Sequence, residues 1–143
     1  MLGQEEWVPC VFELETVPGQ VESSTWTIRN VSTTPVNLSY VLPLATRKGN
    51  QRLFLSGITI GVQDAGPGNT VKEFHARGIT HNQGSPLEPT KYQIPISAPT
   101  RAQHIFQPID CSQFDVVKVV VYFECTAPSG VDVSFVTAKC HYV

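Results

Sequence analysis

The sequence predicts an all-β protein built as a single antiparallel two-sheet β-sandwich. Val, Thr and Ile, whose branched side chains suit a pleated surface, make up 39 of the 143 residues. Gly (10) and Pro (11) recur along the chain as turn signals between short alternating segments. No stretch of helical length keeps apolar residues at helical spacing without a Pro, a Gly or a β-branched cluster inside it. We therefore expect almost no helix.

The first half of the chain predicts four strands: Trp7–Leu14, Ser23–Val31, Val36–Leu44 and Arg52–Val62. Pro9 has no amide hydrogen for a ladder, which predicts an edge strand at the start of the chain. Gly57 interrupts the alternation of the fourth strand, which predicts a bulge or kink there.

The second half predicts five more strands: Val71–Arg77, Lys91–Ile96, Gln103–Ile109, Val116–Cys125 and Val131–Tyr142. The Val116–Cys125 segment alternates most clearly, with Val117, Val119 and Val121 on one face. Pro128-Ser129-Gly130 predicts a tight hairpin between the last two strands.

Eight or nine short strands separated by turn signals are typical of a sandwich or barrel. We favour a jelly-roll arrangement of about eight strands over an immunoglobulin-type one, because the Cys…Trp…Cys spacing of immunoglobulin domains is absent. The length and the lack of a linker-like segment predict a single domain over residues 1–143.

Charge and hydropathy exclude several classes of protein. Charged residues are only 15% of the chain, and the net charge is −2. We expect no nucleic-acid partner, because no basic excess exists to neutralise phosphates. We expect no membrane partner, because no apolar run reaches the length of a bilayer span. The first residues lack the basic and apolar regions of a secretion signal, so we expect synthesis in the cytoplasm.

The four cysteines are Cys10, Cys111, Cys125 and Cys140. A tight hairpin at residues 128–130 would separate Cys125 from Cys140 too far for a disulfide, although a turn that crosses between sheets would relax this. We favour four free thiols that pack as small hydrophobes, and leave open whether any are paired. No Cys-x-x-Cys spacing supports zinc.

No pattern predicts catalysis, so we expect a non-enzymatic protein with no catalytic residues, no metal site and no cofactor. The chain has no Gly-x-Ser-x-Gly motif and no phosphate-binding glycine loop. His75 shares a strand face with Glu73, and these two with His141 are the best case for a metal-dependent enzyme of the cupin kind. The glycine-rich spacing of that family is absent, which favours ordinary strand histidines.

Carbohydrate binding is the alternative function, because sugar-binding sandwiches stack sugars on exposed aromatic rings. The candidates for such contacts are Trp7, Tyr92 and Tyr122. Tyr122 alternates with Lys118 and Glu124, which predicts an exposed face, whereas Trp26 alternates with Ile28, which predicts a core position. A glycan partner therefore stays open.

Two resemblances bear on function. The segment 110–123 (DCSQFDVVKVVVYF), followed by 130–136 (GVDVSFV), resembles the last two strands of galactose-binding-like and related jelly-roll domains. In size, strand content and lack of catalytic motifs the chain also resembles the capsid decoration (cement) and tail proteins of phages and other viruses. That resemblance implies a structural component of a virion, made in the host cytoplasm, which forms a homo-oligomer and joins a larger assembly through protein–protein contacts.

Overall fold

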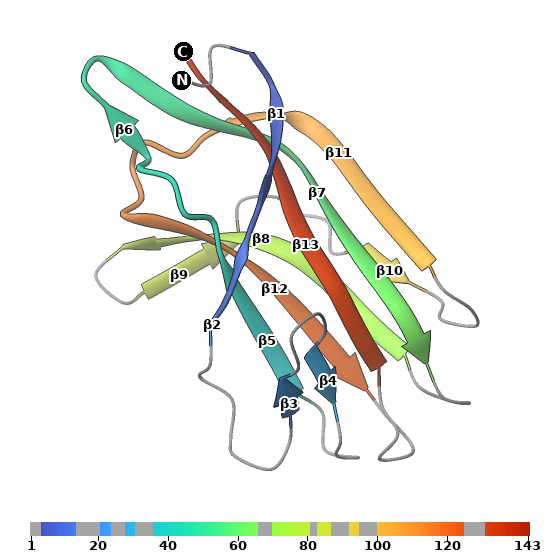
Figure 1. Cartoon of the computed structure of the whole chain (residues 1–143). Helices are drawn as coiled ribbons and strands as arrows, with labels where there is room; N and C mark the ends of the chain where they lie inside the picture. The colour runs from blue at the N-terminus through green and yellow to red at the C-terminus, as the bar shows by residue number, and fades with distance from the viewer. Residues whose placement is uncertain are drawn as a thin grey trace.

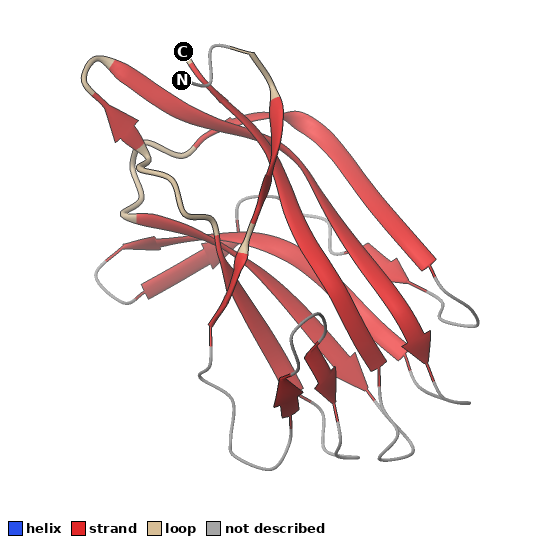
Figure 2. Cartoon of the chain, in the orientation of Figure 1, coloured by secondary structure: helices blue, strands red, loops and turns tan. Residues whose placement is uncertain are grey.

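The computed structural model describes residues 4–13, 21–23, 28–30, 36–65, 70–80, 83–86, 92–94, 100–124 and 131–143. Over these residues the chain is all β, with strands and loops and no helix (Figure 2), which confirms the predicted class. No helix in this part of the chain is long and apolar enough to cross a membrane.

Two antiparallel sheets pack against each other (Figure 1). The first, the β7 sheet, has the order β11-β7-β13-β4-β3, with β1 on β13 and β6 on β7. Its strands are β1 (Glu6–Pro9), β3 (Val21–Ser23), β4 (Ile28–Asn30), β6 (Arg47–Lys48), β7 (Gln51–Ala65), β11 (Thr100–Asp110) and β13 (Val131–Tyr142). The second, the β12 sheet, has the order β10-β8-β12-β5-β2, with β9 on β8. Its strands are β2 (Val11–Glu13), β5 (Val36–Val41), β8 (Thr70–Thr80), β9 (Gln83–Pro86), β10 (Tyr92–Ile94) and β12 (Val116–Glu124).

Eight of these strands pair in a nested order. β1 pairs with β13, β5 with β12, β7 with β11, and β8 with β10, all antiparallel. Among these eight, the first strand therefore pairs with the last, the second with the seventh, and so on inward. The nested pairs alternate between the two sheets, so the chain wraps around one core.

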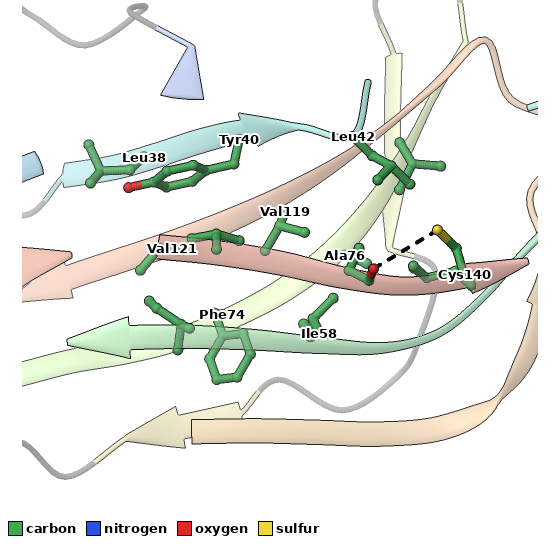
Figure 3. Close-up of a cluster of buried hydrophobic side chains, with 14 of the residues drawn as sticks. Leu38, Tyr40, Leu42, Ile58, Phe74, Ala76, Val119, Val121 and Cys140 are labelled. Atoms are coloured by element: carbon green, nitrogen blue, oxygen red, sulfur yellow. Dashed lines mark hydrogen bonds between the residues drawn. The ribbon is translucent and has the colours of Figure 1, made fainter. Parts of the chain in front are cut away.

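The core lies between the sheets and is built by alternation along the strands (Figure 3). On β12, Val117, Val119 and Val121 point inward and are no more than 1% exposed, as the sequence predicts. The β7 sheet contributes Leu53, Leu55, Ile58, Ile60, Val62, Val133, Val136 and Ala138. Burial of each large aliphatic side chain contributes about 1.5–3 kcal/mol, so this interface between the sheets carries most of the fold's stability.

The interruption predicted at Gly57 is confirmed. Leu55 faces Cys140 in the register and Gly57 faces Lys139, so Ser56 is one extra residue on β7. The bulge reverses the phase of the strand: Leu53 and Leu55 point inward before it, and Ile58 and Ile60 after it.

Two expectations about continuous strands are wrong. The segment 23–31 is not one strand, because Ser23 faces Ile28 in an antiparallel pair. The segment 7–14 divides into β1 and β2, which belong to different sheets. The amide of Cys10, at the crossing, donates to the carbonyl oxygen of Val136 at 2.8 Å. Each of these segments alternates as a continuous strand does, so the pattern alone could not reveal the break.

The hairpin predicted around residues 128–130 is also wrong. β12 pairs with β5 and β8, whereas β13 pairs with β7, β1 and β4, so the chain changes sheets between them. The two strands of a local hairpin would be neighbours in one sheet. Without that hairpin, no strand register separates Cys125 from Cys140, and Cys125 lies outside the described residues, as does Trp26.

Candidate functional site

A groove of about 480 Å³ hollows the outer face of the β12 sheet. It is lined by side chains from three adjacent strands: Asn37 and Ser39 on β5, Lys118, Val120 and Tyr122 on β12, and Glu73, His75, Arg77 and Ile79 on β8. These residues alternate with core residues such as Leu38, Val119 and Phe74, which fixes their outward direction. We call this hollow the groove.

The register arranges the lining residues in three rows across the sheet. Tyr122 lies between Asn37 and Glu73, and Val120 lies between Ser39 and His75. In the third row, Lys118 faces Arg77. Side chains directly opposite in such pairs are about 5 Å apart, so each row is one contiguous strip of surface. Val120 thus forms an apolar floor between two polar rows.

Two polar contacts hold the basic side chains of the groove. Lys118 Nζ lies 2.6 Å from Glu13 Oε1 on the neighbouring strand β2. Arg77 Nη1 lies 3.3 Å from His75 Nε2. A guanidinium carries donors only, so Arg77 donates and His75 Nε2 accepts. The His75 side chain belongs to a residue only 4% exposed, which makes its ring part of the groove's base rather than its rim.

On the outer face of the β7 sheet, large side chains cover two glycines of β7. Trp7 and Ile105 lie over Gly57, and the Phe135 ring lies over Gly61. We call this the glycine face. Between the two glycines, Thr59 points outward and yet is fully buried, with its hydroxyl 3.4 Å from Gln103 Oε1.

Of the aromatic residues predicted as sugar contacts, Trp7 and Tyr122 lie in different sheets. Tyr122 is half-buried and lines the groove, whereas Trp7 is half-buried on the glycine face, in the other sheet. Tyr92 lies on β10, opposite Phe74 in the register, and its side chain is outside the described residues. Of the three, Tyr122 alone lies among the described lining residues of the groove.

Glu73, His75 and His141 are not brought together. Glu73 and His75 line the groove, but His141 belongs to β13, where its ring stacks on Phe54 at 5.7 Å. Across the described residues, no group of three or more potential ligands could hold a metal ion. The three-residue metal centre is therefore wrong as a geometric proposal.

Cys10, Cys111 and Cys140 carry free thiols packed in or against the core. Burial raises the pKa of Cys10 and of Cys111 to about 12, and that of Cys140 to about 11. Because the thiolate is the reactive form, these three groups are poor nucleophiles at neutral pH.

Sequence reasoning missed Asn37, Ser39 and Arg77 as site residues. The signal was present in the alternation, since Leu38 and Tyr40 predict an inward face on β5 and leave Asn37 and Ser39 outward. What the sequence lacked was the pairing of β5 and β8 on either side of β12. Comparison with known protein families and with curated proteins finds no match to this chain.

Proposed function

We propose that this protein is a non-enzymatic structural subunit of a virus particle, a jelly-roll domain that joins other copies through protein–protein contacts. The observation that carries the proposal is the nested pairing of β1 with β13, β5 with β12, β7 with β11 and β8 with β10. Eight strands wrapped in this way are the arrangement expected of a jelly roll, which is common among viral capsid proteins.

The surface supports an assembly role. Charged residues are only 15% of the chain, and charge is depleted at the centres of protein interfaces. Several large apolar side chains are also exposed among the described residues: Val11 (58%), Ile105 (50%), Phe135 (38%) and Val143 (59%). In an assembly these side chains would be covered, and mass action would add to the stability of the fold.

The test is light scattering coupled to size exclusion over a concentration series in reducing buffer, followed by electron microscopy of the largest species. We expect a closed oligomer or particle whose population grows with concentration. Ile105→Lys, which places a charge on an exposed apolar position, is expected to shift the distribution toward monomer. Asn50→Lys, in the exposed turn between β6 and β7, is the matched control. A monomer at every concentration would overturn the proposal.

A further inference from the structure

The groove has the dimensions of a small-molecule site. Its volume of about 480 Å³ falls within the range of about 300–1,000 Å³ typical of ligand pockets. A second hollow of about 520 Å³ lies at one end of the sandwich. There, Thr46 Oγ1 donates to the carbonyl oxygen of Phe114, and Arg47 Nε donates to that of Ser112. Most residues that line this second hollow lie in loops, whereas strands hold all the lining residues of the groove, so the groove is the better candidate.

The polar lining of the groove suits hydroxyl groups. Asn37, Glu73 and Arg77 end in planar groups with two or more polar atoms side by side, and such groups can bond two neighbouring hydroxyls at once. Together they offer donors and acceptors. A polyol presents the same mixture, because every hydroxyl both donates and accepts.

The apolar lining suits the C–H surface of a sugar ring. The floor is Val120, and Tyr122 stands beside it in the row between Asn37 and Glu73. Tyr offers an apolar ring with a polar tip, so it can cover a pyranose face and still bond a hydroxyl. Ile79 extends the apolar lining along β8.

The charges favour a neutral ligand. Glu73 balances Arg77 among the lining residues, and Glu13 neutralises Lys118 at 2.6 Å. The groove and the adjoining Glu13 therefore carry no net charge, so their electrostatics do not select an anion. We propose that the groove binds a neutral saccharide. Asn37, Glu73 and Arg77 hydrogen-bond the sugar hydroxyls, and Tyr122 and Val120 pack against the sugar ring. This site does not depend on the assembly role.

The test is an array of neutral oligosaccharides built from hexoses and N-acetylhexosamines, beside their sialylated and sulfated counterparts. The purified protein is used in whichever oligomeric state it elutes, so that failure of assembly and failure of binding are scored separately. We expect a neutral saccharide to bind with Kd of about 1 mM or tighter by titration calorimetry.

Variants locate the site. Glu73→Gln and Tyr122→Ala are each expected to weaken binding about tenfold or more, the loss expected for a charge-assisted hydrogen bond or a ring contact. Gln103→Ala, on the glycine face, is the control and should leave affinity unchanged. Tyr122→Phe keeps the ring and the fold, so it separates loss of packing from loss of the hydroxyl. Three results would overturn the proposal: no neutral saccharide bound, binding of acidic glycans alone, or equal affinity in the groove variants and the control.

Discussion

The two outer faces of the sandwich are built from the same kind of strand, but their outward side chains are arranged differently. On the glycine face, Gly57 and Gly61 provide no side chain, and Trp7, Ile105 and Phe135 lie down over them. On the β12 sheet, the corresponding outward positions carry Lys118, Val120 and Tyr122, with short polar neighbours on β5 and longer ones on β8. The described part of the glycine face is therefore covered by its own side chains at two glycines, whereas the β12 sheet carries the groove.

This difference shows what decides whether a sheet surface becomes a site. A strand glycine removes the wall of a groove and lets a neighbouring ring cover the backbone. A short side chain such as Val120, with the longer Lys118 and Tyr122 before and after it on the same face of β12, leaves depth instead. The glycine face thus suits contact with another surface, and the groove suits a small ligand.

The largest expected effect comes from Gly61→Ala on the glycine face. A Cβ at Gly61 would overlap the Phe135 ring, so the ring must shift away from this position. We expect the free energy of unfolding to fall by about 1–3 kcal/mol, measured by urea denaturation. In a Phe135→Ala background most of that loss should disappear. An equal loss in both backgrounds would show that the ring does not cover Gly61.

A smaller effect is expected at the Lys118–Glu13 pair beside the groove. Its side chains are 19% and 25% exposed, against 54% and 35% for the Arg52–Asp110 pair at 2.7 Å. A double-mutant cycle with Lys118→Met and Glu13→Gln should give a coupling energy of about 0.5–1 kcal/mol. The cycle at Arg52 and Asp110 is the control and should give less, because water screens that pair more. A larger coupling energy for Arg52 and Asp110 than for Lys118 and Glu13 would contradict the deeper burial of the Lys118–Glu13 pair.

The smallest effect concerns Glu5, at the end of the glycine face. Hydrogen bonds from Lys139 and then Ser56 hold the pKa of Glu5 below its ordinary value of 4.5. A lowered carboxyl pKa stabilises the fold above the unfolded value, and that stabilisation is lost as the pH falls through the folded value. Thermal melts of the wild type and Glu5→Gln should therefore differ slightly at pH 7 and converge below about pH 4.5. A difference that stays constant down to pH 3 would exclude Glu5 as its source.

The sequence alone was sufficient to predict the class of fold and features that lie within a single strand. The alternation of Val117, Val119 and Val121 placed the inward face of β12, and Gly57 marked the bulge in β7. Both features are local, because the alternation of side chains and its interruption by a glycine can be recognised within one strand. The segments 7–14 and 23–31 were misjudged because alternation continues across a change of sheet or direction.

The groove could be predicted only in parts. Glu73 shares a face with His75, and Lys118 shares one with Tyr122, and both pairs are visible in the sequence. The two pairs come together because β5 and β8 pair with the two edges of β12. This pairing brings the segments around residues 37, 75 and 120, which are far apart in the sequence, side by side in the sheet. Such non-local pairing is a property of the whole fold and leaves no mark in the spacing of a single strand.

The contrast between the faces is tested most directly by amide NMR of the labelled protein during titration with a neutral oligosaccharide. The account predicts chemical-shift changes concentrated at Asn37, Glu73 and Tyr122, with Gly57, Gly61 and Gln103 unmoved. Shifts concentrated on the glycine face, or no shifts at any saccharide concentration, would contradict it.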